Sequence, residues 1–147
     1  MEEIIQYVSS ILLLMLLVFG TGVSIHLITL RRKNRGLEAA FDGREPLSYQ
    51  AFYENEFAGT SIPLETVTRV RRLLEGEFTV DLSRLRPDDD FTGNLNFLLK
   101  TNSVAASPLI GRLEREFSIR ITSGEAAGLR TVRDIINLIQ LKEKAQR

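Results

Sequence analysis

An uncharged apolar run near the start of the chain constrains its fold more than any other feature. Residues 4–30 contain no Asp, Glu, Lys or Arg. The run exceeds the roughly 20 residues that a helix needs to cross a bilayer core. A helix also satisfies its own backbone hydrogen bonds in lipid. We therefore expect residues 1–30 to form an uncleaved transmembrane anchor. The alternative, a buried core helix, is rarely so long and so uniformly apolar.

The charges that flank this run predict its orientation. Two glutamates, Glu2 and Glu3, precede it. Four basic residues follow it: Arg31, Arg32, Lys33 and Arg35. The positive-inside rule places the basic side in the cytoplasm. We therefore expect a single-pass protein of the inner or plasma membrane whose soluble domain lies in the cytoplasm. The basic residues also suit anionic headgroups, so membrane lipid is an expected partner.

The composition argues against several classes of function. The net charge is zero, with 19 basic and 19 acidic side chains, so no nucleic-acid partner is expected. The absence of cysteine excludes disulfides, thiolate metal sites and cysteine nucleophiles. One histidine, His26, cannot form a multi-histidine metal site and argues against a Ser-His-Asp triad. We expect no metal site, no catalytic residue and no enzyme activity. We interpret His26 as an interfacial polar residue rather than an intramembrane proton or ligand group.

Two segments precede the main soluble part. Residues 31–47 lose the apolar pattern and are punctuated by glycine and proline, which predicts a basic juxtamembrane linker. Residues 48–62 predict a short aromatic helix capped by Ser48, followed by a turn. Four aromatic residues cluster on one side of this helix: Tyr49, Phe52, Tyr53 and Phe57. A stripe at helical spacing usually docks a helix onto its own domain, so we favour that role over a ligand site.

Residues 63–147 are predicted to form a small helical bundle. Apolar residues at spacings of three and four predict helices over about residues 64–77 and 108–117, and another from Thr131 onward. Thr131 and Asp134 resemble a capping box at the start of the last helix. The fold class is therefore all-α, with an N-terminal transmembrane helix and a small bundle.

Two polar groups in the bundle invite a functional interpretation. Arg69, Arg71 and Arg72 fall mostly on the exposed side of the first bundle helix. Residues 88–90 are three consecutive aspartates, but they lack the alternating ligands, central glycine and distal glutamate of an EF-hand loop. We therefore predict a solvated turn there.

Three segments follow one another along the bundle: "VTRVRRLLEGEFTVDLSRLRPDDDF", "LIGRLEREFSIRIT" and "GLRTVRDIINLI". In this order, they resemble the acyl carrier protein family. They are similar to the family's first helix with its long loop, the end of its second helix, and the entry to its last helix. The resemblance covers about residues 63–140. It implies a carrier-like helical bundle that performs no chemistry of its own.

The resemblance also implies a site. In the family, the serine of an Asp-Ser-Leu motif carries a phosphopantetheine arm whose thiol holds an acyl group as a thioester. Counting back from Phe117 places that serine at Ser103, flanked by Asn102 and Val104 in place of the Asp and Leu. The implied cofactor is 4′-phosphopantetheine. The implied partners are a phosphopantetheinyl transferase and acyl-transferring enzymes. A helix N-terminus also favours the negative charge of a phosphodiester.

The residues around Ser103 leave two interpretations open. Ser107 as N-cap and Pro108 at the first helical position would put Ser103 in the preceding loop. In one interpretation the protein is a membrane-anchored carrier modified at Ser103. In the other it is a carrier-like domain without the arm, which acts as a membrane-tethered interaction module. The partner surface would then comprise Arg112, Arg115, Tyr49, Phe52 and Tyr53. A carrier needs Ser103 accessible to a transferase, whereas an interaction module does not.

Overall fold

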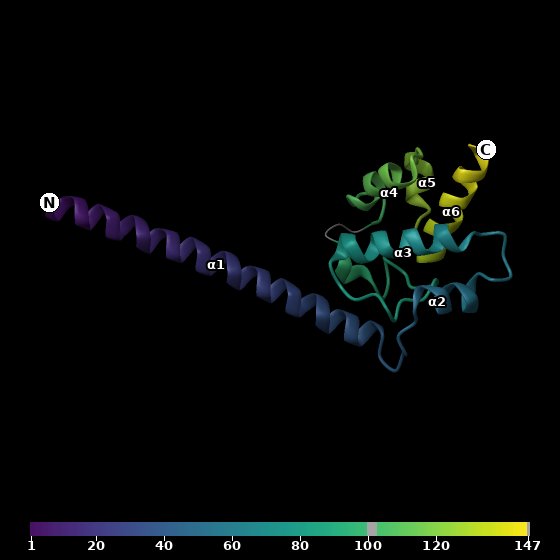
Figure 1. Ribbon diagram of the computed structural model, residues 1–147, viewed down its shortest axis with the longest axis horizontal. Coiled ribbons are helices and arrows are strands. Elements are labelled where there is room, and N and C mark those ends of the chain that lie inside the picture. The colour runs from purple at the N-terminus through teal and green to yellow at the C-terminus, as the bar shows by residue number, and fades with distance from the viewer. Residues whose placement is uncertain (100–102, 147) are drawn as a thin grey trace. The chain divides into compact units, whose positions relative to one another are not determined.

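The computed structural model describes residues 1–99 and 103–146, apart from the side chains of residues 2–5, 25 and 26. The interpretation of His26 lies outside the described residues. Two compact units comprise residues 1–35 and 36–147. The helices, shown in Figure 1, are α1 (Glu2–Ala40), α2 (Tyr49–Glu56), α3 (Leu64–Phe78), the 3₁₀ turn η1 (Asn96–Leu98), α4 (Leu109–Phe117), α5 (Ser123–Ala127) and α6 (Val132–Ala145). The described residues contain no β-strand, only an isolated bridge between Asp90 and Thr131. The predicted all-helical class is confirmed for these residues.

The first unit is the apolar part of α1. In the described part of the chain, α1 is the one helix long and apolar enough to cross a membrane, by length and composition alone. From Tyr7 to Ile28, its described large apolar side chains are exposed. Three hydroxyl groups in this stretch donate to carbonyls about one turn earlier in the same helix, those of Ser10, Thr21 and Ser24. Such bonds satisfy polar side chains without water, as a helix in lipid requires.

The structure differs from the linker predicted over residues 31–47. α1 continues to Ala40, and the residues from Gly36 on belong to the second unit. Leu37 is 5% exposed and Phe41 is fully buried in the core of that unit. Burial of these two apolar side chains holds the segment on the domain, so it is not a free linker over its whole length.

Gly36 packs closely, and we expect Gly36→Ala to destabilise the domain. A Cβ atom at this position would lie 2.6 Å from the ring of Phe97. Overpacking costs about 1–3 kcal/mol. Alanine has a better helix propensity than glycine, which offsets about 1 kcal/mol of this destabilisation. The expected net loss is about 1 kcal/mol, measured by urea denaturation of the full-length chain in detergent.

Gly76 provides a matched control for this substitution. It lies within α3, and a Cβ atom there would meet no atom within 4 Å. Gly76→Ala should therefore stabilise the domain by about 1 kcal/mol through helix propensity alone. Equal stabilisation of both alanine variants would contradict the prediction that Gly36 packs too closely against Phe97 to accept a Cβ atom.

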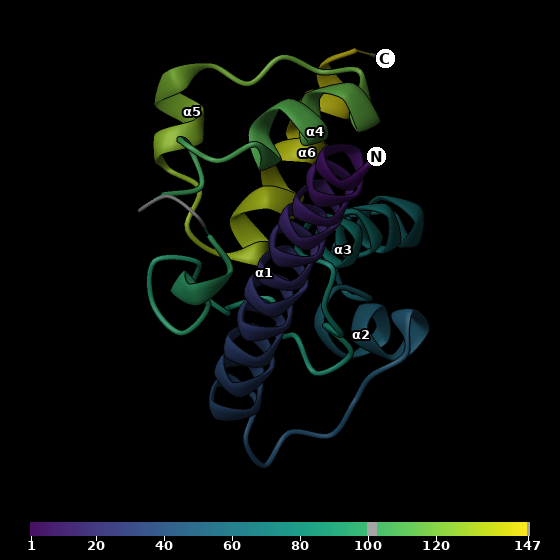
Figure 2. The same cartoon turned by 90° about the vertical axis from the view of Figure 1, so that its left-hand side faces the viewer.

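α3 is the central helix of the second unit. It contacts α2, α4 and α6, which surround it in Figures 1 and 2. Its buried face follows the predicted stripe, with Val67, Val70, Leu74 and Phe78. The buried face of α6 likewise confirms the prediction, with Val132, Ile135, Ile136 and Ile139. All buried apolar side chains of the described residues lie between Leu37 and Ile139. Residues 36–147 thus contain their own core and are expected to fold independently.

α2 docks on α3 through its aromatic side chains and a buried arginine. Ser48 caps α2 as predicted, because its hydroxyl accepts from the backbone N–H of Ala51. Phe52 is fully buried. Arg71 of α3, predicted on the exposed side, is 2% exposed. Its guanidinium stacks near Phe52 and donates to the carbonyls of Leu47 and Ser48. The arginine is buried because the chain entering α2 passes over it and supplies these acceptors.

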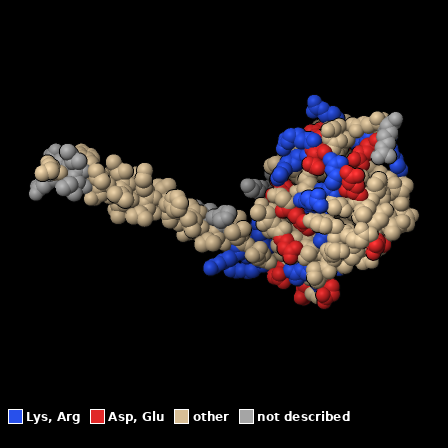
Figure 3. All heavy atoms as spheres, in the orientation of Figure 1, with Lys and Arg blue, Asp and Glu red and all other residues tan. Residues whose placement is uncertain are grey.

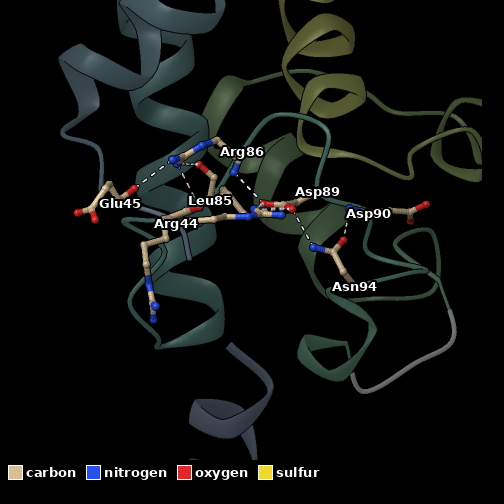
Figure 4. Close-up of polar contacts among 8 residues, drawn as sticks. Arg44, Glu45, Leu85, Arg86, Asp89, Asp90 and Asn94 are labelled. Carbon is tan, nitrogen blue, oxygen red and sulfur yellow. Dashed lines mark hydrogen bonds and ion pairs between the residues drawn. The ribbon is translucent and has the colours of Figure 1, made fainter. Parts of the chain in front are cut away.

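The loop after α3 is fixed by a second buried charge (Figure 4). Asp89, predicted in a solvated turn, has a side chain only 3% exposed. Both of its carboxylate oxygens accept from Arg44 at 2.8 Å. They also accept from the Arg86 backbone N–H and the Asn94 amide, each at 2.7 Å. These donors compensate for the loss of water around the carboxylate, so this part of the aspartate run is internal.

Reciprocal caps begin both α5 and α6. Thr131 and Asp134 form the capping box that the sequence predicted for α6. Thr122 and Glu125 form the same arrangement at α5. The Lys142 ammonium, together with bonds from Thr122, lowers the pKa of the Glu125 carboxyl to about 2. These contacts define where each helix starts and join α5 to α6.

Candidate functional site

The segment before α4 is shaped by Pro108. Proline has no N–H, so the Val104 carbonyl cannot receive the helical bond that a residue at position 108 would normally donate. Ser107 supplies two donors instead: its backbone N–H at 3.0 Å and its hydroxyl at 2.7 Å. The Ser107 hydroxyl in turn accepts from the Leu109 N–H, and Pro108 already has helical dihedral angles. The start of the helix differs by one residue from the sequence prediction, because Pro108 takes the N-cap position and α4 begins at Leu109.

Ser103 therefore lies in a separate turn ahead of α4. Its hydroxyl oxygen accepts from the backbone N–H of Ala106 at 3.3 Å. Its side chain is half-buried, whereas the next residue, Val104, is fully buried. Asn102, the other predicted flanking residue, lies outside the described residues. The turn thus combines a half-buried serine with an apolar residue that fixes it to the core.

This arrangement fits a phosphodiester on Ser103. Ser103 is half-buried rather than enclosed, and the Ala106 N–H directed at its hydroxyl is a donor of the kind that stabilises a nearby anionic oxygen. Val104 is buried in the core beside Ser103, so a group on Ser103 would have a defined position. Within the described part of the chain, no group of three or more His, Cys, Asp or Glu side chains could hold a metal ion.

The predicted partner surface is divided by the structure. Arg112 and Arg115 are exposed on α4. Tyr49 and Tyr53 are half-buried and donate to the Glu75 carboxylate and the Ile62 carbonyl, respectively. Phe52 is buried and cannot contribute to a surface. The aromatic stripe is instead the docking face of α2, which was the favoured interpretation.

A groove between α3 and α4 contains two further arginines. Its volume is about 410 Å³, and its lining includes Arg69, Arg72, Gly76, Arg112, Arg115 and Glu116. Basic side chains gather with acidic ones over the α3–α4 side of the domain in Figure 3. Sequence reasoning placed Arg69 and Arg72 on an exposed face but did not bring them next to α4. Their spacing of three along one helix was the available signal.

Comparison with known proteins points to the same region. Residues 68–139 match the family described as "Phosphopantetheine attachment site". An acyl carrier protein of Thermosynechococcus vestitus is 31% identical over 81 residues, which are 55% of this chain and 95% of that protein. An acyl carrier protein of Helicobacter hepaticus is 29% identical over 77 residues, 52% of this chain and 96% of that protein. No solved structure gives a significant match.

The matched residues coincide with the helical bundle and include the turn that bears Ser103. The match is consistent with 4′-phosphopantetheine as the prosthetic group. Carriers of this kind work by interaction with phosphopantetheinyl transferases and acyl-transferring enzymes, and they are not catalysts themselves. Sequence similarity and helical architecture agree, and the chain belongs to the acyl carrier protein family.

Proposed function

We propose that this protein is a membrane-anchored acyl carrier that bears 4′-phosphopantetheine on Ser103. The observation that carries the proposal is the half-buried Ser103 hydroxyl, bonded to the Ala106 N–H, within the residues that match the attachment family. When bound, the arm supplies a thiol that holds an acyl group as a thioester. The carrier would present this group to acyl-transferring enzymes at a membrane.

The residues of the turn have distinct tasks in this proposal. Ser103 provides the oxygen that is linked to phosphate. The Ala106 N–H lies where it can stabilise the negative charge on that phosphate. Val104, fully buried, holds the turn against the core when no enzyme is bound. Pro108 cannot donate a backbone hydrogen bond, so it separates the turn from α4, and the attachment point precedes the regular part of the helix.

The length and composition of α1 support anchoring. Its apolar stretch exceeds the span of a bilayer core, and the basic residues after it favour a cytoplasmic location for the domain. Tethering would raise the effective concentration of the carrier near enzymes in the same membrane, to about the millimolar range for a short connection. A membrane-bound carrier therefore suits substrates whose processing enzymes are themselves at the membrane.

Intact mass after exposure to a transferase tests both parts of the proposal. The full-length chain would be expressed, membranes collected, and the purified protein treated with a broad-specificity phosphopantetheinyl transferase and coenzyme A. We expect recovery with the membranes and a gain of one phosphopantetheine group. Ser103→Ala should show no gain. Ser107→Ala, which removes the neighbouring hydroxyl that bonds to Val104, is the matched control and should still be modified.

An interaction module without the arm is the second candidate function. The observation that favours it is the placement of Ser103 outside α4, in a turn that ends at Pro108. An unmodified wild-type chain, with an ordinary acyl carrier protein modified in the same tube, would support this alternative and contradict modification of Ser103. Recovery of the chain in the soluble fraction would contradict anchoring.

A further inference from the structure

The groove between α3 and α4 contains more positive charge than its own carboxylates neutralise. Arg112 pairs with Glu77, and Arg69 pairs with Glu116 and, at 3.9 Å, with Glu143. The remaining two arginines of the lining, Arg72 and Arg115, have no carboxylate within ion-pair distance among the described residues.

The two arginines are accessible from solvent. Arg72 and Arg115 are both exposed, and the guanidinium of Arg72 lies 5.6 Å from the centre of the Tyr49 ring. Contact with an aromatic ring leaves the donors at the edge of the guanidinium able to bond elsewhere. A guanidinium presents a planar fork that matches a carboxylate in two parallel hydrogen bonds. The pair can therefore receive two carboxylates from outside the domain.

The shape of the groove suits a segment of chain better than a single ion. Its volume of about 410 Å³ is many times the share of one water molecule in the liquid, about 30 Å³. Gly76 leaves one wall open, since a Cβ atom there would meet nothing within 4 Å. Leu73, half-buried in the same lining, offers an apolar contact beside the charges. The groove thus combines room, charge and a small apolar surface.

The distribution of charge favours a protein over a lipid surface. Glu77 and Glu116 alternate with the arginines, so anionic headgroups arriving as a uniform layer would meet like charges as well as opposite ones. A helix with acidic side chains on one face can place carboxylates at Arg72 and Arg115 and leave neutral positions opposite the glutamates. Arg115 also lines a second hollow, on the α6 side of α4, with Arg120 and Lys142. An acidic partner lying over α4 would therefore find cations on both sides of it.

We propose that the α3–α4 groove is the docking site for an acidic helix of a partner protein, with Arg72 and Arg115 as its principal contacts. α4 supplies one wall of the groove and follows the turn that bears Ser103, so a partner held in the groove would contact the helix that the attachment segment precedes. This role rests on the proposed function, because the partner would be an enzyme that uses the carrier. Binding in the groove itself does not require the arm.

Peptide binding to the full-length chain tests the proposal. The chain would be placed in nanodiscs of zwitterionic lipid. The probe is a fluorescent amphipathic helical peptide with Glu at i, i+3, i+4 and i+7, and its matched control carries Gln at those positions. We expect binding of the Glu peptide that weakens with salt. Arg72→Gln and Arg115→Gln should each reduce affinity about tenfold, since each removes a charge-assisted pair.

A charge-matched variant makes the result specific. Arg130→Gln removes an exposed arginine that pairs with Asp90, outside the groove lining, and should leave peptide affinity unchanged. Equal losses of peptide affinity in all three variants would mean that binding depends only on the net charge of the domain, and this would overturn the proposal. Absence of binding, or equal binding of the Gln peptide, would overturn it as well. The proposal would also be overturned if inorganic phosphate or phosphatidylglycerol vesicles bound in a way that depends on Arg72 and Arg115 while binding of the peptide did not.

Ser103→Ala separates this proposal from the proposed function. The variant should bind the Glu peptide as well as the wild type, because the groove is independent of the hydroxyl. A chain that is modified on Ser103 but does not bind the peptide would support the carrier and contradict the docking site. A chain that binds through Arg72 and Arg115 but is never modified would support the docking site and contradict the carrier.

Discussion

Replacing Arg71 by alanine is expected to reduce the free energy of unfolding of residues 36–147 by about 3–5 kcal/mol. The side chain is 3% exposed and its guanidinium ion-pairs with Glu75 at 3.3 Å. It also donates to the carbonyls of Leu47 and Ser48. Removal leaves these carbonyls and the Glu75 carboxylate without their donor beside the buried α2–α3 interface, which costs more than the net value of the bonds themselves.

The alanine substitution also removes packing at the α2–α3 interface. The guanidinium of Arg71 lies 4.9 Å from the centre of the Tyr49 ring and 5.1 Å from that of Phe52. Urea denaturation followed by tyrosine fluorescence would measure the loss. Arg115→Ala, at an exposed arginine, is the matched control and should change stability by less than about 0.5 kcal/mol. If Arg71→Ala and Arg115→Ala had similar stability, the prediction that Arg71 stabilises the packing of α2 on α3 would be contradicted.

Asp89→Ala should be the second large effect, a loss of about 2–4 kcal/mol. The Asp89 carboxylate accepts from Arg44, from the Arg86 backbone N–H and from Asn94. We place this loss below that of Arg71 because the side chain of Arg44 is 29% exposed and can be hydrated once its partner is removed. The backbone N–H of Arg86 lacks that alternative inside the loop.

The neighbouring aspartate supplies the control for this prediction. Asp88 pairs with Arg133, but its side chain is 75% exposed, so Asp88→Ala should cost at most about 1 kcal/mol. The same denaturation experiment on residues 36–147 compares the two. Equal losses would mean that the aspartate run is solvated throughout, as the sequence alone suggested.

The helices were predictable where local pattern decides the structure. The apolar stripe of α6 and the Thr131–Asp134 cap depend on residues within a few positions of each other, and both are found. Ser48 at the start of α2 is another local signal that the structure confirms. Periodicity and capping involve residues within one or two helical turns, so they can be recognised directly from the sequence.

The errors concern contacts between distant segments. Arg71 has arginine neighbours of similar local character, and its burial depends on the chain that enters α2, more than 20 positions earlier. Asp89 is likewise distinguished from its neighbours by Arg44, which lies 45 positions away. Leu37 and Phe41 interrupt a mixed segment without a clear period, so their burial could not be read from spacing.

The candidate site was predictable in part. Pro108 indicates a separate turn before α4 because proline cannot donate a backbone bond, and the structure has this turn. The position of Ser103 came from family resemblance rather than from any local physical signal. The arginine groove depends on the packing of α3 against α4, which no single helix reveals.

The interruption at Pro108 divides the domain into regions that can open independently. The Ser107 hydroxyl accepts from the Leu109 N–H and so links residues 103–107 to α4, while the bonds from Ala106 to Ser103 and from Ser107 to Val104 lie within the turn. Withdrawal of Val104 from the core would cost about 1.5–3 kcal/mol, far less than melting a helix of the bundle. A transferase that modifies Ser103, as proposed, would therefore meet a segment that can open locally while the helical framework remains intact.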